Sequence, residues 1–206
     1  MIPTWFPDWR GQRCVIVASG PSAVEQPIDL AHGRARCVAV NNSWRLAPFA
    51  DVLYASDAAW WRENDHAGFG GLRVSRSDVD GVLRVAIRDK GHPLRDVMHF
   101  DTPGVIGAGG CSGFQALNLA AQFGATDIAL VGFDARVDNG VHWHGNHERT
   151  GNPTRWTAAI WAANLDAAAS VLAGRGIRVV NCSPVSALTA YEKMGLEEWL
   201  EETWRG

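Results

Sequence analysis

The segment Cys14-Val-Ile-Val-Ala-Ser-Gly-Pro-Ser22 decides the expected fold. Its first five residues are apolar and mostly β-branched, which is typical of a strand buried on both faces of a parallel sheet. The small residues that follow make a tight turn, in which Gly20 supplies backbone freedom and Ser22 can cap a helix. A helix that starts here would aim N–H groups at one point, so the segment indicates either a phosphate-binding turn or an ordinary strand-to-helix turn. The dinucleotide fingerprint G-x-G-x-x-G is absent, which argues against an NAD site.

Composition places the chain among globular α/β proteins. The 206 residues are 47% hydrophobic and 20% charged, which suits one domain over residues 1–206. A net charge of −3 provides no basic surface for bulk nucleic-acid binding. Four cysteines without a CxxC pair indicate buried, reduced thiols and a cytoplasmic protein. We see no secretion signal and expect no membrane span.

Strand-like and helix-like segments alternate along the chain. This alternation predicts a single Rossmann-like domain, with a mostly parallel sheet and helices on both faces. Residues 1–11 are interpreted as an N-terminal arm, and 57–103 as a variable insertion on the acceptor side that holds weak strands at 72–74 and 83–87. Further strands are expected at 36–40, 52–55, 127–131 and 177–180, and helices at 23–30, 114–123 and 155–175, from Ser186–Ala190 onward, and in an acidic tail at 197–204.

Distinctive polar clusters follow the predicted strands. They are Ser19–Ser22, Asn41–Ser43, Ser56–Asp57, Asp134–Arg136 and Asn181–Ser183. Parallel strands share a direction, so we expect these clusters to converge on one edge of the sheet, although ordinary turn chemistry also favours such residues. A glycine-rich loop, Gly104–Gly113, opens a second helix there, with Ser112 placed to cap it or to bind an anion.

Three histidines gather in one loop, at His142, His144 and His147. Their spacing, with Asp134 nearby, allows three interpretations: metal ligation, acid–base catalysis or substrate contact, and a purely structural loop. No distant Cys/His pattern completes a metal set, and the sequence alone leaves the three open. The surrounding arginines could neutralise a diphosphate or could be solvated surface residues; they are Arg136, Arg149 and Arg155.

Several short segments, in this order, resemble the small bacterial α-2,3/2,8-sialyltransferases. They are Val15–Ser22, Val38–Asn41, Cys111–Ala116, Asp127–Asp134, His142–His147 and Asn181–Leu188. The chain also looks like uncharacterised phage and prophage proteins that share Asn41–Trp44 and His142–Gly145. The resemblance implies metal-independent, inverting glycosyl transfer from a CMP-activated sugar to a hydroxyl acceptor, with no cofactor required. Because that family often forms tetramers, it also implies a possible homo-oligomer.

The resemblance also implies roles for individual residues. Gly20, Pro21 and Ser22, together with Ser19 in place of the family's asparagine, would face the donor phosphate. The nucleotide would contact Asn41 and its neighbour Asn42, and the donor would contact Ser112 and Gly113. The general base would be His147, then His144, with His142 as the third candidate. At the end of the Asp134 segment, Arg136 stands where the family has a tyrosine, and this arginine could serve the leaving phosphate.

Two alternatives stay open. The glycine-Pro-Ser turn is also similar to that of archaeal-type 6-hydroxymethylpterin diphosphokinases, which would imply ATP and Mg²⁺ with Asp57 or Asp134 as ligands. The other alternative is a non-catalytic nucleotide-binding or structural phage protein of the same fold. The tyrosine that Arg136 replaces, and a second family tyrosine that is missing from the same loop, favour this second alternative, whereas the histidine cluster favours catalysis.

Overall fold

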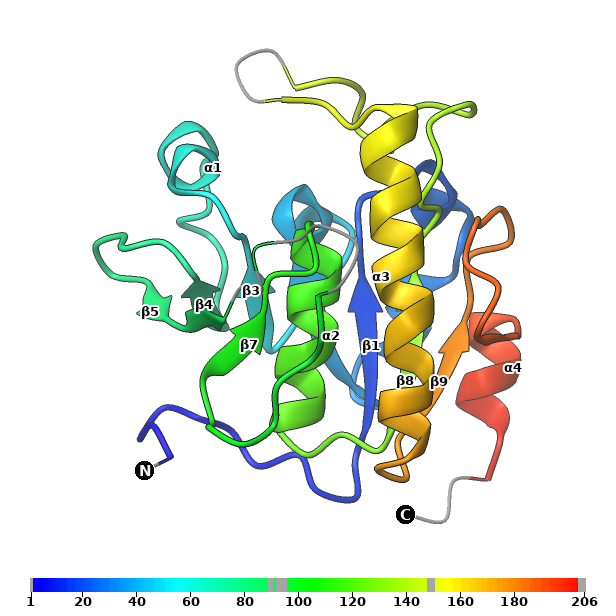
Figure 1. Cartoon of the computed structure of the whole chain (residues 1–206), viewed down its shortest axis with the longest axis horizontal. Helices are drawn as coiled ribbons and strands as arrows, with labels where there is room; N and C mark the ends of the chain where they lie inside the picture. Colours follow the sequence, from blue (N-terminus) through cyan, green and yellow to red (C-terminus); the bar gives the residue numbers. More distant parts are fainter. Residues whose placement is uncertain (1, 89–90, 92–95, 148–150, 204–206) are drawn as a thin grey trace.

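A computed structural model describes residues 2–88, 91, 96–147 and 151–203. Its main feature is an eight-stranded, fully parallel sheet in the order β10-β9-β8-β1-β2-β3-β4-β5 (Figure 1). The strands are β1 Arg13–Val17, β2 Arg36–Val40, β3 Val52–Tyr54, β4 Leu72–Ser75, β5 Leu83–Arg84, β8 Asp127–Val131, β9 Arg178–Asn181 and β10 Glu192–Lys193. A separate pair joins β6 Ala86–Arg88 to β7 Val105–Gly107.

Strand β1 is the centre of the sheet. All five of its residues are buried, and Ile16 lies opposite Val38 of β2 on one side and Leu130 of β8 on the other. The chain adds β2 to β5 outward from β1, and then returns to place β8, β9 and β10 on the opposite side. The order of the strands therefore reverses between β1 and β8, and this is where open α/β sheets bind ligands.

Successive β1 side chains point into two different cores, as the pleat requires. Ile16 packs with Phe114 and Leu117 on one face, whereas Val15 and Val17 belong to the core of the other face, with Trp199. The helices that cover the sheet are α1 Ala58–Glu63, α2 Ser112–Gln122, α3 Arg155–Ala173 and α4 Leu196–Glu201, together with the 3-10 turns η1 Pro21–Glu25, η2 Ile28–Ala31 and η3 Asn41–Arg45. The predicted Rossmann-like α/β class is confirmed. No helix among the described residues combines the length and apolarity that a bilayer span needs.

Three predicted elements differ from the structure. The helix expected at 23–30 is two 3-10 turns that flank Pro27. The strand expected at 83–87 divides at Val85, because its two halves pair with different partners. Ser186–Ala190 is not a helix: Asp166 accepts the backbone N–H groups of Thr189 and Ala190, and the last described helix begins only at Leu196.

The N-terminal arm packs at the amino end of the sheet. Trp9 is 2% exposed and donates its backbone N–H to the Phe123 carbonyl at 2.7 Å. The rings of Phe6 and Trp9 each lie 4.7 Å, centroid to centroid, from the ring of Phe123. Four tryptophans are buried core residues, namely Trp9, Trp60, Trp61 and Trp199, whereas Trp156 is 68% exposed.

A cluster of charged and aromatic side chains closes the amino ends of β1 and β8. Arg13 forms a 3.0 Å ion pair with Asp127, and both side chains are buried. Trp199 donates its indole N–H to Asp127 at 3.1 Å, and the Arg13 guanidinium lies 3.8 Å from the Trp199 ring centroid. Arg178 approaches the same carboxylate at 3.9 Å. We refer to Arg13, Asp127, Arg178 and Trp199 as the amino-end cluster.

Candidate functional site

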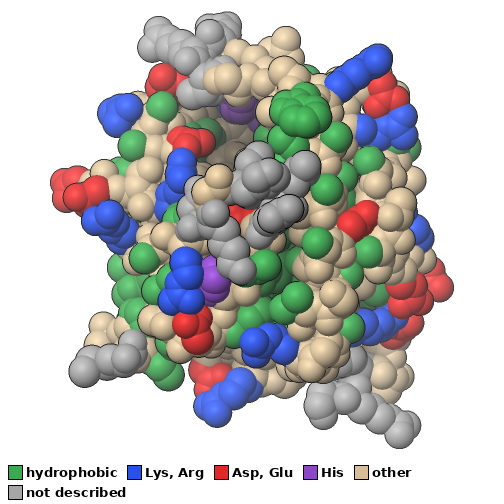
Figure 2. All heavy atoms as spheres, viewed as in Figure 1, with side chains coloured by type: hydrophobic (Ala, Val, Ile, Leu, Met, Phe, Trp, Pro, Cys, Tyr) green, Lys and Arg blue, Asp and Glu red, His purple; other side chains and the backbone are tan. Residues whose placement is uncertain are grey.

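A cavity of about 850 Å³ lies at the carboxyl ends of the parallel strands. Residues from the segments that follow five of the strands line it: Ser19 and Gly20 after β1, Asn41 after β2, Ser56 and Asp57 after β3, Arg76 after β4, and Asp134 and Arg136 after β8. Four of the five polar clusters that follow predicted strands therefore lie around one cavity, as expected. Figure 2 shows a hollow in the upper half of the molecule, with a histidine at its rim.

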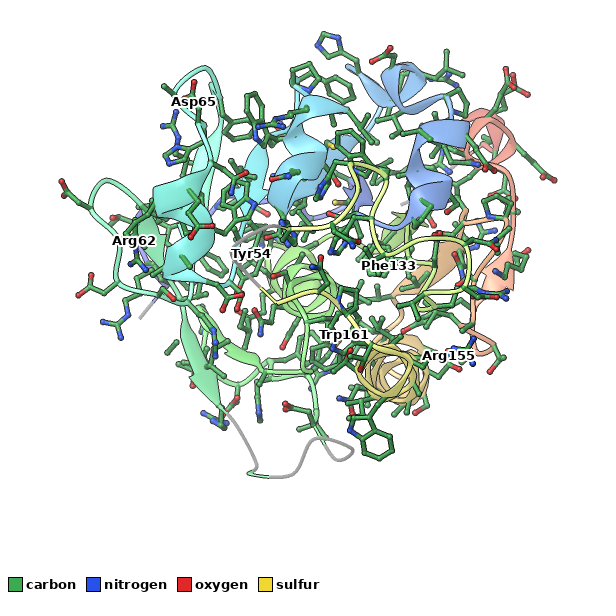
Figure 3. All side chains as sticks on the ribbon, turned by 90° about the horizontal axis from the view of Figure 1, so that it is seen from above. Tyr54, Arg62, Asp65, Phe133, Arg155 and Trp161 are labelled. Carbon is green, nitrogen blue, oxygen red and sulfur yellow. The ribbon has the colours of Figure 1, made fainter. Side chains whose placement is uncertain are left out.

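The fifth cluster supports the wall of the cavity. Ser183 accepts the Phe133 N–H at 2.8 Å, and Ser186 donates its hydroxyl to the Phe133 carbonyl at 2.6 Å. Asn181 in turn donates to the Ser186 hydroxyl at 3.0 Å. These bonds fix Phe133, whose side chain borders the central space seen from above in Figure 3, with Trp161 on a neighbouring side.

The predicted site residues divide into two groups. Those that line the cavity are Ser19, Gly20, Asn41, Ser112, Gly113, Asp134, Arg136, His142 and His147. Those that do not are Pro21, Ser22, Asn42 and His144. Arg155 is exposed and lies outside the lining, and Arg149 falls outside the described residues.

The Gly-Pro-Ser turn uses its own N–H groups to join the ends of β1 and β8. Gly20 donates to the Gly132 carbonyl at 2.9 Å, and Ser22 donates its backbone N–H to Asp134 Oδ2 at 3.0 Å. The Ser22 hydroxyl also donates to the other carboxylate oxygen of Asp134. Burial raises the pKa of Asp134, while the bonds from Ser22 lower it. A phosphate placed at this turn would find both N–H groups already bonded.

The segment after β2 is also held by hydrogen bonds. Asn42 accepts the indole N–H of Trp60 at 2.8 Å, which explains why its side chain is not in the cavity. Ser43 donates to the Ala18 carbonyl at 2.9 Å. Asn41 lines the cavity with a φ of 52°, and Ala135 does so with a φ of 49°; among the described residues, no other non-glycine residue has a positive φ. Such strain commonly gathers at functional sites.

The first turn of α2 faces the cavity through Ser112 and Gly113. The predicted cap differs from the structure: the N-cap is Cys111, whose Sγ accepts the Phe114 N–H at 3.5 Å. Burial raises the pKa of the Cys111 thiol to about 11, so the thiol stays protonated at neutral pH. A Cβ on Gly113 would lie 2.9 Å from the Phe133 ring, so this close approach requires glycine.

The three histidine rings contact one another. Their centroids are 5.0 Å apart for His142 and His144, 4.8 Å for His142 and His147, and 5.0 Å for His144 and His147. Trp143 anchors the loop, because its backbone N–H donates to the Ser19 carbonyl at 3.0 Å and its indole N–H to the Ser43 hydroxyl at 3.2 Å.

All three imidazoles favour the neutral form. Burial, followed by the neighbouring histidines, lowers the pKa of His142 to about 4. Burial, then His147 and Arg45, lowers the pKa of His144 to about 4. Burial also lowers the pKa of His147, and the charge of Glu63 opposes that shift. Two neutral imidazoles, those of His142 and His147, therefore open on the cavity at pH 7.

The metal interpretation of the cluster gains no geometric support. Within residues 2–88, 91, 96–147 and 151–203, no three His, Cys, Asp or Glu side chains are arranged to hold a metal ion. The neighbouring carboxylate, Asp134, already accepts two hydrogen bonds from Ser22. The arrangement suits proton transfer or direct contact with a ligand.

Arg76 and Trp161 are two lining residues that sequence reasoning missed. Arg76 directly follows β4, so the rule that identified the other strand-end clusters would also have found it. Trp161 lies on the face of α3 that also contributes Ala158 and Leu165, a spacing that resembles ordinary core packing. Its indole lies 3.2 Å from the position that a Cβ on Gly110 would occupy.

Comparisons of the chain with protein-family models, with curated proteins and with solved structures found no match. The likeness to sialyltransferases therefore rests only on the short sequence segments quoted above, and the cavity provides the independent basis for a functional proposal.

Proposed function

We propose that this protein transfers a sugar from a nucleotide-activated, CMP-type donor to an acceptor hydroxyl, with inversion and with a histidine as general base. One observation carries the proposal: the neutral imidazoles of His142 and His147 open on a cavity of about 850 Å³ at the point where the strand order reverses. The volume lies within the usual range of ligand sites, and the position is the usual one for open α/β sheets.

The proposed chemistry is a single in-line displacement. The imidazole takes the proton of the acceptor hydroxyl while the acceptor oxygen bonds to the anomeric carbon. The bond from that carbon to the phosphate oxygen breaks, and the nucleotide leaves with the electron pair. The lowered pKa values of His142 and His147 keep both imidazoles unprotonated at neutral pH, so either can accept this proton. Of the expected bases, His147 and His142 line the cavity and His144 does not.

Two groups on the cavity wall can stabilise the departing phosphate. The first turn of the eleven-residue helix α2 presents Ser112 and Gly113. Arg136, on the β8 side, is 40% exposed and is paired with Asp138, so it can exchange this partner for an anion. Donors that are fixed before the reaction stabilise developing negative charge effectively.

The diphosphokinase alternative requires carboxylates that are free to bind Mg²⁺. Asp134 accepts both hydrogen bonds of Ser22, and Asp57 lies 3.4 Å from Arg76. Both carboxylates would have to give up these partners, so this alternative has less support. The non-catalytic alternative predicts nucleotide binding without turnover, and the same assay separates it from glycosyl transfer.

The decisive experiment combines nucleotide binding with turnover in three histidine variants. We expect CMP or a related nucleotide to raise the melting temperature of the wild type. We expect His147→Ala or His142→Ala to lower transfer from a labelled CMP-sugar by about 10²–10⁴-fold while nucleotide binding is retained. His144→Ala is the matched control, because it belongs to the same ring cluster but lies outside the cavity lining. A wild type that gives no thermal shift with a full panel of nucleotides and nucleotide sugars would contradict the proposal.

A further inference from the structure

A second, smaller cavity adjoins the first along the side chain of Arg76. It has a volume of about 350 Å³ and is lined by Arg76, Ser77, Arg84, Val85, Ala86 and Ile87. Arg76 lines both cavities. The second cavity belongs to the 57–103 segment, which the sequence assigns to the acceptor side.

Positive charge dominates this cavity. Arg76 forms an ion pair with Asp57 at 3.4 Å, and the two side chains are 43% and 67% exposed, so the pair is weak. Arg84 is exposed and forms no ion pair with any other described residue. Both charged side chains that line this small space are therefore guanidinium groups, while the carboxylates of Asp57, Asp78 and Asp80 belong to neighbouring segments outside its lining.

The wall that holds these arginines is fixed by hydrogen bonds. The hydroxyls of Ser75 and Ser77 both donate to the Ser56 carbonyl, at 3.3 and 2.9 Å, and the Ser77 N–H donates to the Ser75 hydroxyl at 3.0 Å. Ser75 of β4 lies in register with Arg84 of β5. The backbones that carry the two arginines are thus tied to each other and to the end of β3, and a fixed backbone limits the entropy lost on binding.

We propose that this second cavity binds a phosphate monoester group carried by the acceptor. The inference rests on the proposed function, in which the acceptor must reach the main cavity, and Arg76 borders both spaces. A phosphate monoester carries a charge of about −1.5 to −2 and three acceptor oxygens, which is enough for both guanidinium forks. A carboxylate has two oxygens, and one arginine fork occupies both.

The test compares three ligands on three proteins. Glucose 6-phosphate, glucuronate and glucose are titrated by NMR or calorimetry into the wild type and into the Arg84→Gln and Arg88→Gln variants. Arg88 is the matched control: it belongs to the same segment, pairs with Asp101 at 2.9 Å and lines neither cavity. We expect glucose 6-phosphate to bind the wild type most tightly, and Arg84→Gln to weaken this binding about tenfold, as loss of one charge-assisted hydrogen bond predicts. Arg88→Gln should bind like the wild type.

Several outcomes would overturn the inference. They are wild-type binding of glucose as tight as that of glucose 6-phosphate, equal binding of glucuronate, an equal effect of the two arginine variants, and no binding of glucose 6-phosphate at all. A CMP titration on the same proteins tests the proposed function separately. If CMP fails to bind but glucose 6-phosphate binds through Arg84, the proposed function fails and the phosphate site stands.

Discussion

The two ends of the parallel sheet differ in how their charged side chains are paired and buried. At the amino end, Asp127 is fully buried and receives Arg13, Arg178 and the Trp199 indole. At the carboxyl end, the ion pairs Arg76–Asp57 and Arg136–Asp138 are about half exposed and border open space. Two residues with positive φ, Asn41 and Ala135, lie at the carboxyl end as well.

This difference separates stability from function within one sheet. Side chains whose partners all come from the chain itself contribute to folding, and a ligand could only disturb them. Half-exposed charges and neutral imidazoles still have hydrogen-bonding capacity that a ligand can use, and strained backbone is common at such sites. Variants of the two ends should therefore change different measured quantities.

The largest expected effect on stability belongs to the amino-end cluster. Asp127→Ala leaves the buried Arg13 without its carboxylate, and loss of one partner of a buried pair costs about 3–5 kcal/mol of unfolding free energy. Urea denaturation measures the loss. Asp57→Ala, in the 67% exposed partner of Arg76, is the comparison at the cavity end and should leave the unfolding midpoint close to that of the wild type. Equal losses in the two variants would remove the distinction between the two ends.

Asp134 is the cavity residue expected to behave like the amino-end cluster. Asp134→Ala leaves the buried Ser22 without an acceptor for its N–H and hydroxyl, at a cost of about 1–3 kcal/mol for an unsatisfied buried group. Denaturant unfolding monitored by circular dichroism measures it. Asp134→Asn keeps an acceptor oxygen and should lose less. If Asp134→Ala unfolds like the wild type, the carboxylate has no structural role in the turn.

Trp161 should affect binding more than folding. If the proposed nucleotide stacks on its indole, Trp161→Ala should weaken nucleotide binding by about 1–3 kcal/mol, the usual value for one base on one aromatic ring. Calorimetric titration with CMP measures this change. Trp156→Ala, in the same helix but 68% exposed and outside the cavity lining, is the matched control. Unchanged CMP affinity in Trp161→Ala would show that the ring only packs.

The last expected effect is a dependence of stability on pH, which is absent at neutral pH and grows below about pH 6.5. The unfolded histidines have an ordinary pKa of 6.5, whereas burial lowers the folded pKa of His142 and His144 to about 4. Between these values the unfolded chain binds more protons, so stability is complete above pH 6.5 and falls as the pH drops toward 4. Unfolding midpoints across this range measure the effect. The His142→Gln/His144→Gln double variant should show a flatter dependence of the unfolding midpoint on pH. If its dependence equals that of the wild type, these two histidines are not the cause.

The sequence predicted the parts of the fold that depend on local pattern. The strands at 36–40 and 127–131 have the expected bounds, because continuous apolar, β-branched runs are distinctive. The same reasoning failed at Ser186–Ala190, since the backbone there is held by Asp166, which lies more than twenty residues earlier in the chain. Tertiary hydrogen bonds of this kind leave no local signal.

The sequence also predicted which strand ends border the candidate site, but not the long-range contacts of their side chains. The strand-end rule located Asn41, Asp57 and Arg136 correctly at the cavity. It could not show that Asn42 turns away to hold Trp60. Nor could it show that the N–H groups of the glycine turn bond to Gly132 and Asp134, just after β8, because these contacts join segments more than a hundred residues apart.

The close approach between Gly20 and Asp134 has a consequence for evolution. A Cβ at position 20 would lie 2.5 Å from Asp134 Oδ1 and from the Gly132 carbonyl oxygen. The Asp134 carboxylate occupies the space that a side chain at position 20 would need. It can take this position only because residue 20 is glycine. Related chains should therefore keep or lose these two residues together. Gly20 and Asp134 together offer a signature for finding such chains where the short motifs alone are too weak.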